Sequence, residues 1–422
     1  MPTKSPLREL RRDPLAFLGG LAHEVGDVAP FSIGEERVVL LSDPALAREV
    51  LVAGHRDFVK QNVLRTRPLE LDPDRGLMMN DDPAAHVRGR RIFQPAFSAE
   101  RLAAYEGTVG EHAERIARSW RDGQTLDLTA ELRPLTLAML AESVFDLRLG
   151  DDERLFERWL HDLLASFAFA SSTGRDLLGL LRAPRSVVRT ARAHTQLLAR
   201  LQEVLQERRG SDNTDVPALA ARALETPDGP TEAQATMDCL GILLAGVDTT
   251  ATAITWALLE LARRPEELDN LYDEAVEADG NPDALTRTRN VFAETLRLYP
   301  PSWYIGRRAR VETKAGDVSL QAGTVALVSP YLIHRDPRFH DDPDRFEPER
   351  RLEDRPRHAY LPFGAGPRQC LGERLAWLEG TLVVAAIARR WRLEPVDARS
   401  PAPAARATLA PARPARIVVR AR

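Results

Sequence analysis

The 422-residue sequence has little cysteine, little lysine and no long apolar run. Its two cysteines, Cys239 and Cys370, are too few for a disulfide framework or a multi-cysteine zinc site. Its 58 basic and 62 acidic residues give a formal charge of −4, without the basic excess that a general nucleic-acid-binding protein needs to neutralise phosphates. With 44% hydrophobic residues, the chain has too much apolar material to be disordered over most of its length.

The sequence also lacks the signals that direct a protein to or across a membrane. Its most apolar uninterrupted run, Cys239 to Val247, is far shorter than the roughly 20 residues needed to span a bilayer. Residues 1–13 contain no apolar stretch followed by a small-residue cleavage site. We therefore expect a cytoplasmic protein without a membrane span.

What the sequence does contain is a long helical region between two parts with strand character. Periodic apolar residues predict helices over most of about 83–300, whereas β-branched runs and turn residues predict small sheets within about 28–60 and 305–422. Thr231 and Gln234 form a capping-box pattern at the start of one long helix, and no proline follows until Pro265. The centre of this helix is apolar on nearly every side, which predicts that it is buried. We expect a mainly α protein with small β-sheets.

The strongest functional signal is the segment Phe363 to Gly372, with the sequence FGAGPRQCLG. Its first two glycines allow a tight turn and a close approach of the backbone to a flat ligand. Gly372 opens the last predicted helix, so Cys370 lies at a positive dipole end, which we expect to lower its pKa and favour a thiolate. Such a thiolate can serve as the single axial ligand of an iron. Arg368 is suited to pair with a carboxylate of the bound group, whereas Cys239 is interpreted as an ordinary buried cysteine.

Two charged pairs have helical spacing. Glu294 and Arg297 are three residues apart and His86 and Arg90 are four apart, so each pair shares one face of a helix. Alone, neither pair decides a function, because exposed ion pairs contribute little and a basic helix start is often only solvated.

An acid and a hydroxyl interrupt the apolar centre of the long helix at Asp248 and Thr249. Burial of both is costly unless each has a partner. One interpretation is structural: Thr249 bonds back to a carbonyl in the preceding turn, and Asp248 forms a salt bridge. The alternative is that the two residues act together in a reaction.

Together these motifs resemble those of the cytochrome P450 family, whose haem-binding loop has the form F-G-x-G-x-R-x-C-x-G. The matching positions are Phe363, Gly364, Gly366, Arg368, Cys370 and Gly372. The resemblance implies the P450 fold as a single domain over residues 1–422, with haem b between the long central helix and the cysteine loop with the last helix. It also implies that Cys370 is the ligand of the haem iron, with Phe363, Gly364 and Gly372 beside the cofactor.

The resemblance assigns roles to the charged motifs as well. The side chains implied to bind the haem propionates are His86, Arg90, Arg368 and either Arg307, which we favour, or its neighbour Arg308. The residues implied to form a structural triad on the proximal side are Glu294, Arg297 and Arg350. Neither set follows from spacing alone.

The family's reaction is the insertion of one atom of O2 into an apolar small molecule, by C–H hydroxylation or epoxidation. The resemblance implies that Thr249 bonds dioxygen and that Asp248 relays protons to it, which requires hydrogen-bond reach. Two alternatives are a haem-thiolate peroxygenase or isomerase, and a non-catalytic haem sensor or carrier. The Asp248–Thr249 pair argues against both, because family members that use peroxide often lack it.

Electrons are expected from separate proteins. The chain has no dinucleotide-binding glycine fingerprint and is too short for a fused flavin reductase, so we expect a ferredoxin and a ferredoxin reductase as partners. Arg88, Arg91 and Arg374 are candidates for a basic proximal surface on which an acidic ferredoxin docks. We expect a monomer that works in secondary metabolism.

The substrate itself is the least determined feature. By the resemblance, the candidate substrate contacts are Leu77, Phe167, Phe169, Leu244, Ala245, Trp303 and Ile305. They indicate an apolar ligand such as a terpene, fatty acid, steroid or macrolide. Each of these residues is equally compatible with core packing.

Overall fold

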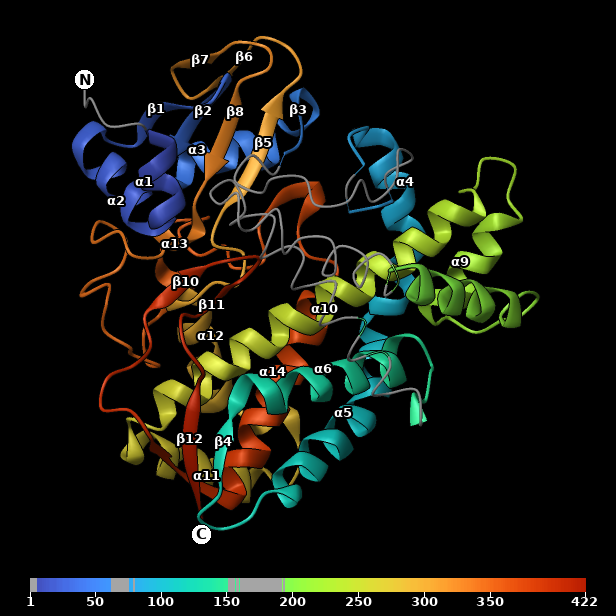
Figure 1. The fold of residues 1–422 in the computed structure, drawn as a ribbon, viewed down its shortest axis with the longest axis vertical. Helices are drawn as coiled ribbons and strands as arrows, with labels where there is room; N and C mark the ends of the chain where they lie inside the picture. Colours follow the sequence, from blue (N-terminus) through green and yellow to red (C-terminus); the bar gives the residue numbers. More distant parts are fainter. Residues whose placement is uncertain are drawn as a thin grey trace.

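The arrangement of helices and small sheets is seen in a computed structural model, which describes residues 6–61, 76–78, 80–150, 156, 159, 192 and 194–422. One end holds α1, α2 and the largest sheet, and α10 runs through the middle of the helical remainder (Figure 1). The candidate substrate contacts Phe167 and Phe169 lie outside the described residues.

Helices make up most of the described chain, as the sequence predicts, and polar caps begin many of them. Asp82, for example, accepts a hydrogen bond from the backbone N–H of Ala84 at the start of α4. The α-helices of the described part of the chain are α1 (Pro6–Arg12), α2 (Pro14–Val25), α3 (Pro44–Arg48), α4 (Pro83–Phe93), α5 (Ala99–Ser119), α6 (Leu128–Val144), α9 (Val216–Leu224), α10 (Glu232–Leu261), α11 (Pro265–Ala278), α12 (Thr286–Leu298), α13 (Pro330–Ile333) and α14 (Glu373–Arg390).

The strands among the described residues form four small sheets. The largest has the order β1-β2-β8-β5-β3, in which only β2 and β8 are parallel; the others are β4-β12-β9 and the hairpins β6–β7 and β10–β11. The strands are β1 (Val28–Ile33), β2 (Glu36–Leu41), β3 (Phe58–Lys60), β4 (Thr125–Asp127), β5 (Ile305–Ala309), β6 (Thr313–Ala315), β7 (Val318–Leu320), β8 (Val325–Val328), β9 (Trp391–Pro395), β10 (Pro403–Ala405), β11 (Leu409–Pro411) and β12 (Arg416–Ala421). All of these strands except β4 lie within the predicted β regions, about 28–60 and 305–422. β4 lies outside them and forms a strand because it pairs with the distant β12.

The long helix α10 has the start and the burial that its sequence predicts. Thr231 accepts from the backbone N–H of Gln234 at 3.2 Å, and the Gln234 side chain accepts from the backbone N–H of Thr231 at 2.8 Å. At about 1.5 Å per residue, its 30 residues span about 45 Å. In the described part of the chain it is the one helix long and apolar enough to cross a membrane, but 78% of its most apolar stretch is buried inside the protein. It is therefore the core helix of this fold.

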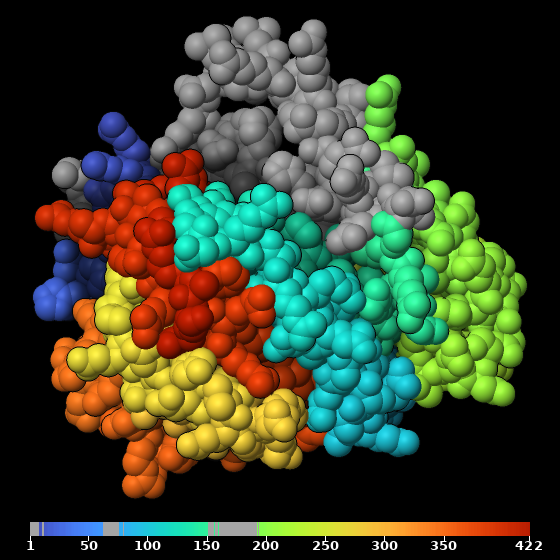
Figure 2. Space-filling view, turned by 90° about the horizontal axis from the view of Figure 1, so that it is seen from below, coloured from blue at the N-terminus to red at the C-terminus, as the bar shows by residue number. Residues whose placement is uncertain are grey.

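Helices from both sides pack closely on this core. A Cβ atom at Gly246 of α10 would lie 2.7 Å from Leu140 Cδ2, so α6 approaches α10 to a distance that only glycine allows there. Figure 2 shows the atoms of residues from about 100 to 145, in cyan to teal, against those of the C-terminal part of the chain, in red, although more than 200 residues separate them in the sequence. The pairing of β12 with β4 joins these segments.

The packing of α14 on α12 predicts a strong effect of one added methyl group. A Cβ at Gly380 would lie 2.3 Å from the ring of Phe292, which is itself buried. We expect Gly380→Ala to lower the free energy of unfolding by about 1–3 kcal/mol, because neither helix can move aside cheaply. Urea unfolding measures the effect. The matched control is Gly107→Ala on the exposed face of α5, where no neighbour meets the new methyl group. It should be stabilising by about 0.5–1 kcal/mol, and equal effects at the two sites would contradict the packing argument.

Candidate functional site

The cysteine loop is a tight turn whose glycines are required by its geometry. Gly364 and Gly366 both have φ of +73°, in the left-handed region. A Cβ at Gly366 would also lie 2.0 Å from the carbonyl oxygen of Leu51, so the loop packs directly on another backbone segment. The backbone N–H of Cys370 donates to the carbonyl of Phe363 at 2.9 Å and closes the loop. Cys370 is thereby presented just before α14, as the sequence predicts.

The electrostatics of Cys370 correct one expectation. Its side chain is accessible, yet the surrounding protein desolvates it and raises its pKa to about 11. The backbone N–H of Gly372 and the charge of Arg90 oppose this rise and only partly offset it. Desolvation by the surrounding protein therefore outweighs the Gly372 N–H and the charge of Arg90, and a metal cation would supply the stabilisation that a thiolate here needs. Cys239, by contrast, is a buried free cysteine, as expected.

Four cationic or basic side chains gather near this loop. Arg90 donates to the carbonyl of Gln369 at 2.5 Å, and Arg368 donates to the carbonyl of Asn80 at 2.5 Å. His86 lies within reach of Arg368, whose charge joins burial in lowering the pKa of His86 to about 4. Arg307 is 8% exposed, and burial and the charge of Arg368 lower its pKa to about 9. These four groups lie close together although α4, β5 and the cysteine loop are far apart in the sequence.

The same four side chains have unused capacity to bind an anion. Among the ion pairs recorded for the described residues, none includes His86, Arg90, Arg307 or Arg368. The Nε2 atom of His86 is buried without a hydrogen-bond partner. Buried charges are costly unless they are paired. The chemistry of the set therefore fits a group that carries carboxylates and binds a sulfur ligand.

The neighbour of Arg307 has a different partner. Arg308 pairs with Glu36 at 2.8 Å on the far side of the sheet and is partly exposed. Because side chains alternate along a strand, β5 directs the two arginines to opposite faces. The geometry thus favours Arg307 over Arg308 for an anion near Cys370.

The predicted structural triad is fully buried and paired. Arg297 makes two bonds of 2.8 Å to the two carboxylate oxygens of Glu294, and Arg350 reaches Glu294 at 3.2 Å. The remaining Arg297 N–H groups donate to the carbonyls of His334, Pro343 and Arg345. A buried ion pair holds when its hydrogen-bonding capacity is satisfied in this way. The triad joins α12 to the segment that leads toward the cysteine loop.

The acid and the hydroxyl of α10 have the partners of the structural interpretation. Thr249 Oγ1 donates to the carbonyl of Ala245 at 2.6 Å. Asp248, 5% exposed, pairs with Arg133 of α6 at 2.7 Å and also accepts a hydrogen bond from Thr408 at 2.9 Å. Neither Arg133 nor Thr408 is a candidate from sequence motifs, because both lie more than 100 positions from Asp248.

Comparison with known proteins identifies the family. The family model described as Cytochrome P450 matches residues 6–419. The chain belongs to the cytochrome P450 family. The fold agrees: a P450 crystal structure from Thermus thermophilus has a TM-score of 0.78 at 27% identity, covering 98% of this chain and 97% of that one.

Three similar curated proteins are named as a monooxygenase, a synthase and an oxygenase. Cyclooctat-9-en-7-ol 5-monooxygenase of Streptomyces melanosporofaciens is 34% identical over 92% of this chain and 86% of its own length. Cyclooctatin synthase of the same organism is 32% identical, over 92% and 87%. Pentalenene oxygenase of Streptomyces avermitilis is 29% identical, over 91% and 88%. This P450 is therefore a monooxygenase that binds haem b, which confirms the predicted fold class, enzyme class and cofactor.

The candidate substrate contacts separate into two groups in this P450. Ile305 lies beside the cysteine loop, because a Cβ at Gly364 would be 3.5 Å from its Cδ1 atom. Leu244 and Ala245 are partly exposed on the turn of α10 that precedes Thr249. Trp303, in contrast, is 3% exposed, packs in a core cluster beside the first sheet, and donates from its indole to the carbonyl of Arg406. For Trp303, core packing is the interpretation that the contacts favour.

Leu77 connects this region to two titratable groups. Its backbone N–H donates to Asp238 of α10, and its carbonyl accepts from Nδ1 of His86 at 3.1 Å. Burial raises the pKa of Asp238 to about 7. Burial also raises the pKa of Glu379 on α14 to about 8, against an opposing hydrogen bond from Thr250. Neither Asp238 nor Glu379 was identified from the sequence. The signal that could have found them is a single carboxylate on an otherwise apolar helix face.

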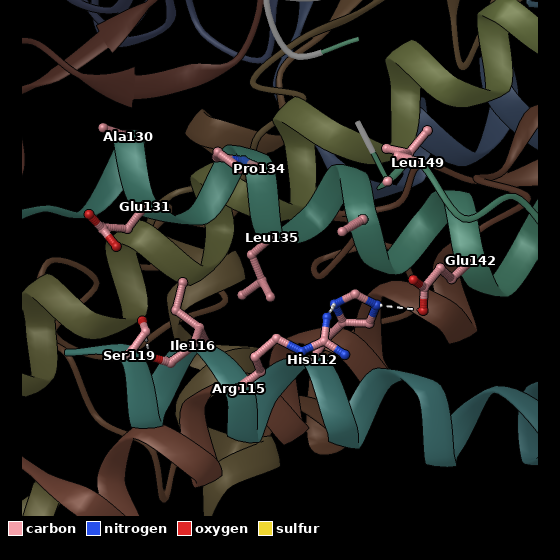
Figure 3. A pocket seen from close by; sticks show the side chains of 12 residues that line it. His112, Arg115, Ile116, Ser119, Ala130, Glu131, Pro134, Leu135, Glu142 and Leu149 are labelled. Carbon is pink, nitrogen blue, oxygen red and sulfur yellow. Dashed lines mark hydrogen bonds and ion pairs between the residues drawn. The ribbon is translucent and has the colours of Figure 1, made fainter. Parts of the chain in front are cut away.

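A surface groove among the described residues lies away from the cysteine loop. It has a volume of about 430 Å³ between α5 and α6, and side chains of both helices project into it (Figure 3). His112 pairs there with Glu142 at 2.9 Å. None of the predicted haem or substrate residues lines this groove.

Two buried histidines, His334 and His340, bond to the backbone of the segment just before the cysteine loop. Neither of them was identified from the sequence. The backbone N–H of Leu361 donates to Nε2 of His334, so Nδ1 carries the proton and donates to the carbonyl of Arg297 at 3.1 Å. His340 donates from Nε2 to the carbonyl of Ala359 at 2.9 Å. Burial lowers the pKa of both rings, with the charge of Arg297 adding to the effect. The neutral rings join the triad to the residues just before Phe363.

Neutral buried histidines make stability depend on pH. Below about pH 6.5 the histidines of the unfolded chain bind protons, whereas His334 and His340 stay neutral in the folded protein. The free energy of unfolding should therefore decrease as the pH is lowered below about 6.5. Each ring contributes a slope of up to about 1.4 kcal/mol per pH unit until the lower folded-state pKa is reached. Urea unfolding between about pH 5 and 8 measures this. His334→Gln should be less stable at neutral pH but lose its share of the slope, whereas exposed His23→Gln should change neither. An unaltered slope in His334→Gln would contradict the assignment.

Proposed function

We propose that this P450 oxidises a cyclic terpene, with the Cys370 thiolate as the axial ligand of its haem iron. The observation that carries the site assignment is the gathering of unpaired cationic and basic side chains around an accessible, desolvated thiol. The substrate class rests on relatives whose names concern cyclooctatin and pentalenene. The partly exposed apolar residues Leu244 and Ile305 are compatible with a hydrocarbon ligand.

Four side chains would hold the propionates. Arg90 and Arg368 each have one guanidinium N–H on a backbone carbonyl and further N–H groups to donate. His86 has a free Nε2, and Arg307 has only a neighbouring carbonyl as its recorded partner. Arg–carboxylate bonds are strong and directional, so this set both anchors and orients the group.

When bound, the haem supplies the redox chemistry that activates dioxygen, with the thiolate donating electron density to the iron. The chain's own contribution is the control of protons on α10. Thr249 holds a proton at Oγ1 in a bond to Ala245, and we assign Asp248 to bring protons from the side of Arg133, which is 34% exposed. In this role the bond of Thr249 to Ala245 and the pairing of Asp248 with Arg133 are the contacts that the two side chains make before proton transfer. A buried acid that is paired with a partly exposed arginine is consistent with proton delivery in the reaction.

Electrons would come from an acidic ferredoxin served by its reductase. Arg88 and Arg91 on α4 and Arg374 on α14 are exposed, and no recorded ion pair of the described residues includes them. The bond between Arg90 and Gln369 ties α4 to the cysteine loop, so this basic surface lies on the side of the thiolate. Charge complementarity of this kind raises the rate of docking. A peroxygenase would need neither this surface nor the acid on α10.

The ligand assignment predicts the spectrum of two cysteine variants. Cys370→Ser should lose the red-shifted Soret band that a reduced, carbon-monoxide-bound haem thiolate gives, because the serine oxygen cannot replace the sulfur. The matched control is Cys239→Ser in α10, which should keep the band. Absorbance of the purified proteins after reduction under carbon monoxide measures both. Persistence of the band in Cys370→Ser would mean that the sulfur ligand is elsewhere.

The substrate class predicts a spectral response to terpenes. Pentalenene should shift the haem spin state at a concentration at least about tenfold lower than dodecanoic acid, a steroid or a macrolide does, which corresponds to about 1.4 kcal/mol of binding preference. Leu244→Trp should raise the half-saturating concentration by filling the site. Val311→Trp, at an exposed position, should leave it unchanged. A stronger response to the fatty acid, steroid or macrolide would refute the terpene assignment.

A further inference from the structure

The turn between β10 and β11 brings a buried hydroxyl to the acid of α10. Thr408, 7% exposed, donates from Oγ1 to Oδ2 of Asp248 at 2.9 Å. The same Oγ1 lies 3.3 Å from Oγ1 of Thr252, one helical turn after Asp248 on the same face of α10. A segment from the C-terminal part of the chain thus contacts the central helix at the acid itself.

The direction of these hydrogen bonds follows from the number of protons. A hydroxyl has one proton to donate, and Thr408 gives it to Asp248, whose other oxygen is paired with Arg133. Thr252 must therefore donate to Thr408. The result is a directed chain of two hydroxyls that ends on the carboxylate, and bonds in such a chain strengthen one another.

The two oxygens of Asp248 consequently have different partners from different elements. Oδ1 accepts from Arg133 of α6, whose side chain is 34% exposed, whereas Oδ2 accepts from the buried Thr408. Without the hydroxyl, a fork-shaped guanidinium is suited to take both oxygens. The carboxylate would then turn toward Arg133 and away from the Thr249 side of the helix.

The position of the turn does not depend on the Thr408 side chain. The carbonyl of Leu409 accepts from the indole N–H of Trp256 at 2.7 Å, and the backbone N–H of Leu409 donates to the carbonyl of Pro301 at 3.1 Å. The carbonyl of Arg406 accepts from the indole of Trp303. Backbone bonds on both sides therefore hold the turn in place, so a substitution at position 408 removes the hydroxyl without releasing the turn.

We propose that Thr408 is a positioning residue for Asp248: its hydroxyl holds Oδ2 and keeps the carboxylate oriented for proton transfer along α10. This rests on the proposed function, in which Asp248 brings protons to the Thr249 side. Loss of the hydroxyl should hinder proton transfer and leave haem binding intact. Dioxygen that has taken two electrons from one NADPH, and two protons, leaves the enzyme as hydrogen peroxide when the proton transfer needed to break its O–O bond is hindered. When that transfer succeeds without substrate, two more electrons from a second NADPH and two more protons complete the reduction of dioxygen to two molecules of water.

The first experiment compares two pairs of proteins. In each pair, one member has a hydroxyl group at position 408 and the other lacks it. The unaltered enzyme is compared with Thr408→Val, and Thr408→Ser is compared with Thr408→Ala. The haem-loaded enzyme is supplied with NADPH through a plant-type ferredoxin and its reductase, without added substrate, and peroxide released per NADPH consumed is measured. We expect the ratio of water to peroxide formed to fall at least about threefold in the Val and Ala variants and to be restored by Ser.

Two reference variants separate this proposal from the proposed function. Asp248→Asn should reduce the same ratio at least as much as Thr408→Val. If Asp248→Asn has no effect, the proton role of the acid fails and the positioning role fails with it. If Asp248→Asn has its effect but Thr408→Val does not, or if Ser and Ala behave alike, only the positioning role is overturned. Thr255 is also on α10, and its buried hydroxyl has no hydrogen-bond partner among the described residues. Thr255→Val should therefore leave the ratio of water to peroxide unchanged.

A second experiment tests the contact without turnover. A double-mutant cycle on urea unfolding combines Thr408→Val with Asp248→Asn in the haem-loaded protein. The two changes should be non-additive, with a coupling of about tenfold in the unfolding equilibrium constant, because each removes the same hydrogen bond. Additive effects would overturn the proposal. If the Val variant does not fold with haem, the Ala variant replaces it in both experiments.

Discussion

The structure depends on the gathering of three partly or fully buried arginines and a neutral histidine beside a desolvated sulfur, with no ion pair among the described residues to balance the arginines. His86, Arg90, Arg307 and Arg368 converge on the loop of Cys370, and burial lowers the pKa of all four. The same environment raises the pKa of the thiol instead of lowering it. Protein groups alone leave both the cations and the sulfur poorly stabilised. A cofactor that carries carboxylates and a metal cation satisfies both needs at once, which is why haem b fits this site.

A buried polar network lies beside the segment that leads into the cysteine loop. The Glu294–Arg297–Arg350 triad is almost fully satisfied by carboxylate and carbonyl oxygens, and His334 extends it to the backbone at Leu361. Because each member is buried and bonded in a defined direction, the network cannot shift in small steps. It places the cysteine loop relative to α12, while Gly380 allows α14 to pack against the same helix.

On α10, neighbouring elements fix the orientation of the buried Asp248 carboxylate. Arg133 and Thr408 approach Asp248 from α6 and from the β10–β11 turn, and each takes a different oxygen. The hydroxyl of Thr249 stays on its own helix. Control of the carboxylate therefore lies outside the acid–alcohol motif, in two segments that carry no motif of their own.

Local chemistry determined much of this protein from the sequence. The turn of the cysteine loop follows from glycines at positive φ, and the start of α10 follows from Thr231 and Gln234, because these effects involve residues within a few positions of one another. Tertiary structure decided what desolvation and distant partners control: the raised pKa of Cys370, the pairing of Arg308 with Glu36, the core position of Trp303, and the partners of Asp248. The position of Cys370 at a helix start was visible in the sequence, but the desolvation that raises its pKa depends on packing between segments hundreds of residues apart.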